Sequence, residues 1–117
     1  MNISTFSALT QLSSHTLRYY EKIGLLSNIS RNASGHRSYS AKDVEWVRFI
    51  NRLRDTGMPL AKIRHYADLR AVGDTTFDTR CTLLEQHRDA LRLRLEKELE
   101  HLQALDAKIE YYQSHKP

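Results

Sequence analysis

Four side chains that suit contact with an anion or a base edge recur at the period of a helix near the start of the chain. His15, Arg18, Tyr19 and Lys22 stand at positions i, i+3, i+4 and i+7, so a helix carries them on one face. Positive charge and aromatic rings on one face are typical of a helix placed against nucleic acid. A solvated basic helix is the alternative, because charge runs often serve only solubility.

The helix that presents these residues is delimited in the sequence. Ser13 or Ser14 suits the N-cap, and Gly24 suits the end. Leu17 and Tyr20 lie on the opposite side, which makes the helix amphipathic.

A second short helix is expected just before it. Ser4 suits its N-cap, Phe6 and Leu9 lie on one side, and Leu12 falls in the turn that follows. Two short helices joined by such a turn form a helix-turn-helix, in which the second is the recognition helix.

The pattern from residue 25 to residue 40 is not helical. Leu25-Leu26 and Arg37-Ser38-Tyr39 would flank a hairpin whose turn lies near Asn32 to Gly35. With Arg31 and His36, this hairpin has the side chains of a wing that grips phosphates beside the groove. A flexible polar loop is the alternative.

Two further helices are predicted between residues 40 and 72. Ser40 and Asp43 resemble a capping box that opens the first helix, which ends at Gly57. Its expected core residues are Trp46, Val47, Phe49, Ile50 and Leu53. The next helix begins near Pro59 and turns Leu60, Ile63, Tyr66 and Ala67 inward. Lys62, Arg64 and His65 stay outside and would form a second wing.

The last part of the chain predicts one long helix. No Gly or Pro occurs from Phe77 to Gln113, and Leu, Glu, Arg and Ala are frequent. Such a helix reaches roughly 55 Å and needs a partner for its apolar seam. Pairing in a homodimer is the simplest solution, and folding back on its own domain is the alternative. The expected dimerisation residues are Leu84, Leu91, Leu95, Leu99, Leu102, Leu105, Ile109 and Tyr112.

The distribution of charge separates the first part of the chain from the long helix at its end. Residues 1–73 hold 11 Lys and Arg against 5 Asp and Glu, whereas residues 74–117 hold 7 against 9. A basic first part suits a polyanion. We therefore expect a mainly α protein, with a winged helix-turn-helix DNA-binding domain at 1–73 and a linker and dimerisation helix at 74–117.

Other classes of function lack support in the sequence. There is no apolar run of membrane-spanning length and no signal peptide, so we expect a cytoplasmic protein without a membrane partner. No nucleophile elbow, phosphate-binding loop or dinucleotide fingerprint occurs, so an enzyme is not expected. Cys81 stands alone, and no cofactor or metal site is predicted; Glu98 and His101 have a spacing used in metal bundles but are expected on a solvated face.

Three blocks of the sequence together resemble the MerR family of bacterial transcription regulators. They are residues 16–26 (TLRYYEKIGLL), 35–40 (GHRSYS) and 49–58 (FINRLRDTGM). The resemblance implies a winged helix-turn-helix, a second wing made by a helix pair, and dimerisation through an antiparallel coiled coil. It also implies binding to a pseudo-palindromic promoter with an overlong spacer. Bending and untwisting of that DNA realigns the promoter elements for RNA polymerase.

The resemblance also implies roles for particular residues. His15, Thr16 and Arg18 would face the major groove, Tyr19 and Tyr20 the phosphates, and Arg37 and Tyr39 belong to the first wing. Together with the residues of the helix face, the predicted DNA-contacting set is Ser14, His15, Thr16, Arg18, Tyr19, Tyr20, Lys22, His36, Arg37, Tyr39, Lys62 and Arg64.

The sequence does not identify the signal that the regulator would sense. Compact family members that respond to aldehydes or thiol stress look closest, which makes Cys81 a candidate sensor thiol, although an inert thiol is the more common case. A regulator without an effector, and a coiled-coil adaptor whose basic head binds something other than DNA, are the alternatives.

Overall fold

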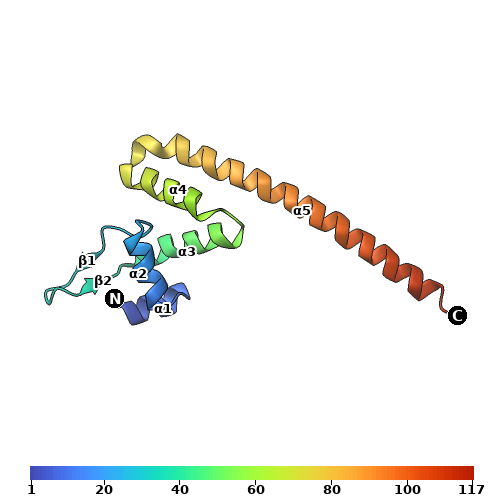
Figure 1. Ribbon diagram of the computed structural model, residues 1–117, viewed down its shortest axis with the longest axis horizontal. Coiled ribbons are helices and arrows are strands. Elements are labelled where there is room, and N and C mark those ends of the chain that lie inside the picture. The colour runs from blue at the N-terminus through green and yellow to red at the C-terminus, as the bar shows by residue number, and fades with distance from the viewer. The chain divides into compact units, whose positions relative to one another are not determined.

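A computed structural model describes residues 1–117, and it is mainly helical with one small antiparallel hairpin (Figure 1). The elements are α1 (Ile3–Thr10), α2 (Ser14–Lys22), β1 (Ser30–Arg31), β2 (Arg37–Ser38), α3 (Ala41–Asp55), α4 (Leu60–Val72), a 3-10 turn η1 (Asp74–Thr76) and α5 (Phe77–Ser114). The predicted fold class is confirmed, including the single long helix at the end.

The chain forms two compact units, Met1–Cys81 and Thr82–Pro117. The first unit therefore includes the first turn of α5. The functional division that we expect after residue 73 stays a prediction.

The first unit has a closed hydrophobic core. Its fully buried side chains come from α1, α2, the segment after α2, α3 and α4: Phe6, Thr10, Leu17, Tyr20, Leu25, Leu26, Val47, Ile50 and Ile63. Removal of this apolar surface from water stabilises the unit and fixes the directions in which the outer faces of its helices point.

Side-chain caps set where the helices begin. The Ser13 hydroxyl caps α2, and Ser40 and Asp43 form the predicted capping box of α3. The cap of α1 was wrongly predicted. Asn2 takes that place instead of Ser4, because its Oδ1 accepts the Thr5 N–H at 2.9 Å, and the helix starts at Ile3, before Ser4.

The end of α2 differs from the prediction at two leucines. Gly24 has a φ of 84°, and the turn it permits lets the Leu25 N–H donate to the Tyr20 carbonyl at 2.9 Å. Leu25 and Leu26 are buried in the core and belong to no strand. The hairpin is shorter than expected, pairing Ser30 with Ser38 and Arg31 with Arg37.

Helices α3 and α4 follow the predicted pattern with small departures. Ile63, Tyr66 and Ala67 are buried as expected. Leu60 is 38% exposed, because it is the first residue of α4 and precedes the buried stripe. Leu9, in α1, is also more exposed than predicted, at 39%.

Helix α5 differs from the other helices in burying none of its residues. No helix of the structure has the length and apolarity that crossing a membrane requires.

Candidate nucleic-acid interface

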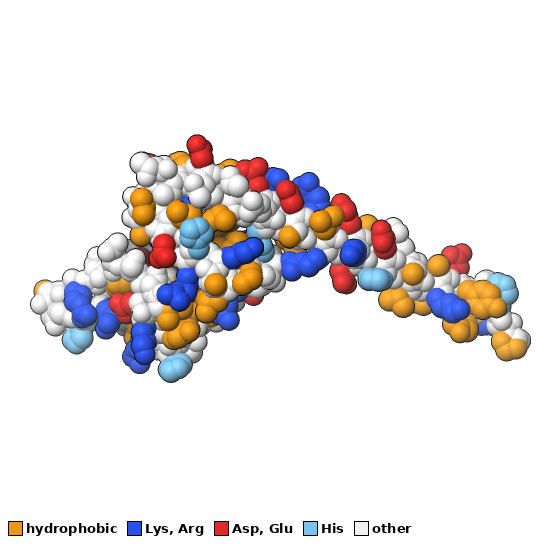
Figure 2. Space-filling view, turned by 45° about the horizontal axis from the view of Figure 1, so that its top comes forward, with side chains coloured by type: hydrophobic (Ala, Val, Ile, Leu, Met, Phe, Trp, Pro, Cys, Tyr) orange, Lys and Arg blue, Asp and Glu red, His pale blue; other side chains and the backbone are white.

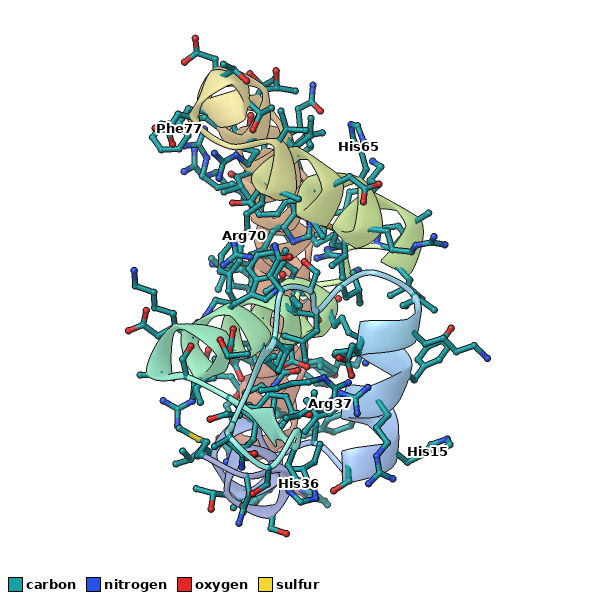
Figure 3. The ribbon with its side chains drawn as sticks, turned by 90° about the vertical axis from the view of Figure 1, so that its left-hand side faces the viewer. His15, His36, Arg37, His65, Arg70 and Phe77 are labelled. Carbon is teal, nitrogen blue, oxygen red and sulfur yellow. The ribbon has the colours of Figure 1, made fainter.

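The outer face of α2 carries the four residues that the helical spacing brings together. His15, Arg18, Tyr19 and Lys22 are all exposed, whereas Leu17 and Tyr20 on the other side are buried. His15 points away from the body of the first unit (Figure 3). Packing of the inner side thus holds a cationic and aromatic face toward solvent, as a recognition helix requires.

The start of α2 is held by a local hydrogen-bond pair. The Ser13 Oγ accepts the Thr16 N–H at 3.1 Å and donates to the Thr16 hydroxyl at 3.0 Å. Ser14 and Thr16 are half-buried. The cap engages one lone pair of the Thr16 hydroxyl and leaves its proton for another acceptor.

The hairpin carries the predicted wing at residues 30–38. Asn32 organises its turn, since its Oδ1 accepts the N–H groups of Ser34 and His36, each at 3.0 Å. Gly35 supplies the positive φ of 79° that the turn needs. Arg31 donates to the Gly35 carbonyl at 2.8 Å, and His36 is exposed at the turn (Figure 3).

An ion pair joins the wing to α2. The Arg37 Nε lies 3.0 Å from Oε1 and 2.8 Å from Oε2 of Glu21, which belongs to the last turn of α2. This hydrogen bond to a carboxylate raises the pKa of the Arg37 guanidinium above its usual value. Arg37 is therefore in contact with the recognition helix as well as with solvent.

Two predicted DNA-contacting tyrosines lie in the core. Tyr20 is 2% exposed, and its hydroxyl accepts a hydrogen bond from Arg54. Tyr39 is 3% exposed and stacks on Phe6 with a ring separation of 4.2 Å. Burial raises the pKa of the Tyr39 phenol. Both rings therefore pack in the core of the first unit, and their predicted contact with DNA stays a prediction.

A shallow groove of about 320 Å³ connects α2 with the wing. Its lining includes Arg18 from α2 and Arg31, His36 and Arg37 from the hairpin. Several Lys and Arg side chains lie on the visible face of the first unit (Figure 2). The groove thus gathers three guanidinium groups, which suits a phosphate-bearing polymer.

The second predicted wing lies on α4. Lys62 and Arg64 are exposed and follow Pro59, which occupies the N-cap position of this helix. His65 also points outward (Figure 3). The structure places these cations on an accessible helix surface of the first unit.

Several residues that hold the interface together could not be found from the sequence. Arg48 donates from Nε and Nη2 to the Leu9 carbonyl at 3.1 and 3.0 Å, and Asn51 donates to the Thr10 carbonyl at 2.9 Å. Both residues satisfy carbonyls at the end of α1. Helical spacing marks Arg48 and Asn51 only as polar, so it does not reveal these partners.

Trp46 has a polar role in addition to packing. Its Nε1 donates to the Leu25 carbonyl at 2.7 Å, and the Arg70 guanidinium lies 4.1 Å above its ring. The sequence indicated a core tryptophan, and the hydrogen bond fixes the segment that leaves the recognition helix.

The residues predicted for dimerisation and sensing lie on α5. Leu84 and Leu91 are half-buried, whereas the other six are 52–64% exposed: Leu95, Leu99, Leu102, Leu105, Ile109 and Tyr112. Cys81 is exposed and forms no disulfide. No three metal-ligating side chains come together in the structure.

Comparison with known families and proteins gives consistent matches. Residues 1–69 match the family described as MerR HTH family regulatory protein, and residues 44–112 match MerR, DNA binding. An uncharacterized HTH-type transcriptional regulator of Haemophilus influenzae is 33% identical over 105 residues, which cover 90% of this chain and 78% of that protein.

Two solved structures share the architecture. A putative MerR family transcriptional regulator from Listeria monocytogenes has a TM-score of 0.90 at 36% identity, with 98% of this chain and 87% of that chain covered. HiNmlR, described as a MerR family regulator lacking the sensor domain and bound to promoter DNA, has a TM-score of 0.84 at 30% identity, with coverage of 98% and 91%.

Proposed function

Because this chain belongs to the MerR family of DNA-binding transcription regulators, we propose that it acts as a homodimer on a pseudo-palindromic promoter. In this proposal the dimer bends and untwists a spacer that is too long, so that RNA polymerase engages both promoter elements. Members of this family are transcription regulators and not enzymes.

The observation that carries the proposal is the exposed face of α2 beside a cationic wing. His15, Arg18, Tyr19 and Lys22 face solvent, and the groove next to them is lined by Arg18, Arg31 and Arg37. In the proposal His15, Thr16 and Arg18 read base edges, with Ser14, Tyr19, Lys22, His36 and Arg37 toward the backbone. Lys62 and Arg64 form the second wing. The similarity to a regulator bound to promoter DNA supports this arrangement.

The apolar side chains of α5 support the homodimer. Six of the predicted seam residues are more than half exposed in one chain, and an amphipathic helix of this length needs a partner surface. A second copy of α5 in antiparallel orientation supplies that surface. Two-fold symmetry of the dimer then matches two half-sites on the DNA.

For the inducing signal, the chain offers its single thiol. Cys81 is exposed near the start of α5 and is open to an aldehyde, another electrophile or an oxidant. The alternative is a regulator without an effector. A change in promoter binding after alkylation of the wild type, but not of Cys81→Ser, supports sensing, and equal behaviour of both proteins supports the alternative.

Selection of bound sequences from a random duplex pool tests DNA recognition, followed by titration of the selected site at two salt concentrations. We expect a two-fold-symmetric site. Arg18→Ala should lose about 1–3 kcal/mol of discrimination at one position of each half-site. Arg92→Ala, which removes the same charge from α5, should keep the selectivity.

The rival proposal is a coiled-coil adaptor with a basic head. Binding to every duplex alike, or to none, with no selected motif and no effect of Arg18→Ala, would contradict the regulator proposal and favour the adaptor. Steep dependence of affinity on salt does not by itself distinguish the two, because it reports phosphate contacts and not base reading.

A further inference from the structure

The contact between α2 and the wing uses only one nitrogen of the Arg37 guanidinium. Its Nε is engaged by both oxygens of Glu21, at 3.0 and 2.8 Å. The terminal Nη groups make no hydrogen bond within the chain, and the side chain is 44% exposed. A guanidinium offers five donors in a fixed plane, so one edge can meet Glu21 while another meets a phosphate.

The pairing of the two hairpin strands places two arginines opposite each other, and Glu21 contacts one of them. Arg31 and Arg37 are directly opposed in the two-residue ladder, and like charges in that position repel. Arg31 turns to the Gly35 carbonyl at 2.8 Å, and Arg37 turns to Glu21. The carboxylate therefore holds the Arg37 side chain against the recognition helix, while Arg31 is held by the turn, and both still line the same groove.

We propose that Glu21 is a positioning residue for DNA binding, which holds Arg37 so that its free Nη groups meet a backbone phosphate and fixes the wing relative to the recognition helix. The inference rests on the proposed DNA-binding function and goes beyond it. It assigns a favourable role in binding a polyanion to an acidic side chain.

The direction in which DNA affinity changes when Glu21 is removed distinguishes a positioning role from simple charge repulsion. A carboxylate beside the DNA backbone repels phosphates, so its removal would ordinarily tighten binding. If Glu21 positions Arg37, its removal weakens binding instead, because Arg37 no longer has the orientation that its phosphate contact requires. The two cases predict opposite changes in affinity.

The experiment titrates the selected operator with Glu21→Ala, Arg37→Ala and Glu45→Ala over a range of salt concentrations. Arg37→Ala should flatten the plot of log affinity against log salt by about 0.9 for each phosphate that the protein no longer neutralises, and by twice that for a dimer. Glu21→Ala should weaken binding and flatten the slope in the same direction. Glu45, an exposed carboxylate on α3, is the matched control, and Glu45→Ala should leave affinity unchanged or slightly raised.

Two further variants sharpen the test. Glu21→Gln keeps an oxygen that accepts the Nε–H, so it should lose less affinity than Glu21→Ala. In the double variant Glu21→Ala/Arg37→Ala, loss of Glu21 should not weaken binding further, since the residue it positions is gone, and loss of its negative charge should leave the affinity unchanged or slightly raised.

The outcomes distinguish the inference from the function on which it rests. Tighter binding by Glu21→Ala, or equal effects of Glu21→Ala in the presence and absence of Arg37, overturns the positioning role while selective binding by the wild type stands. Absence of selective binding by the wild type overturns the proposed function itself. Circular dichroism and thermal unfolding of each variant check that it is folded.

Discussion

The two units of the chain reach their structures by different means. Met1–Cys81 encloses a core to which four helices contribute, whereas no residue of Thr82–Pro117 is buried. In the first unit, apolar side chains find partners within the same chain. In the second, leucines and an isoleucine stay in contact with water, which disfavours the isolated helix as a final state.

Polar contacts follow the same division. Trp46 with the Leu25 carbonyl and Arg48 with the Leu9 carbonyl join residues 21 and 39 positions apart. On α5, Arg88 pairs with the adjacent Asp89, and Ser114 bonds to Glu110 one turn earlier. The printed contacts of the first unit thus join distant parts of the sequence, whereas those of α5 are local, and the proposed homodimer would cover its exposed apolar side chains.

The largest expected effect is the loss of the proposed dimer. Leu95→Asp places a charge in the proposed seam at two sites of the dimer. Each buried Leu contributes about 1.5–3 kcal/mol, so we expect association to weaken at least roughly a hundredfold. Sedimentation equilibrium measures the change directly.

Leu93→Asp is the matched control for the seam. Both leucines are about 60% exposed in one chain, at 62% for Leu93 and 59% for Leu95. Two residues along a helix turn the side chain by about 200°, so Leu93 lies away from the seam. Equal loss of dimer in both variants would contradict the proposed face, and retention of dimer by Leu95→Asp would contradict the seam.

A smaller effect is expected from the core of the first unit. Ile50→Ala removes a fully buried side chain and should lower the free energy of unfolding by about 2–5 kcal/mol. Because Ile50 packs within its own chain, the loss should be the same at two protein concentrations, as measured by urea unfolding.

Val72→Ala provides the comparison for this core variant, since Val72 is 69% exposed at the end of α4. Its effect should stay within about 0.5 kcal/mol. An Ile50→Ala loss that changes with protein concentration would mean that the core of the first unit also depends on the partner.

Much of this fold was predictable because its signals are local. The apolar period of α3, the Ser40 and Asp43 capping box and the Asn32–Gly35 turn each lie within one stretch of sequence. The α1 cap was not predictable, since Asn2 and Ser4 both have side chains that suit an N-cap and the local sequence does not choose between them.

The candidate site was only partly predictable for a related reason. Helical spacing found the outer face of α2, but Tyr20 and Tyr39 have rings that suit either a core or a phosphate. Their stacking and hydrogen bonds involve Phe6 and Arg54, which are distant in sequence. The ion pair between Glu21 and Arg37 likewise joins two elements whose mutual placement depends on the whole core.

The smallest expected effect comes from removing the N-cap of α3, which tests whether this cap stabilises only its own helix. The Ser40 Oγ accepts the Asp43 N–H at 3.1 Å, and Asp43 accepts the Ser40 N–H at 2.9 Å, which satisfies two donors at the start of α3. Ser40→Ala should cost about 1 kcal/mol, and Ser40→Thr, which keeps the acceptor, should cost less. Urea unfolding compares the two variants. A loss well above about 2 kcal/mol would show that the cap also supports the wing, because Tyr39, the residue before Ser40, stacks on Phe6. Equal losses in both variants would show that the hydroxyl is not what stabilises the helix.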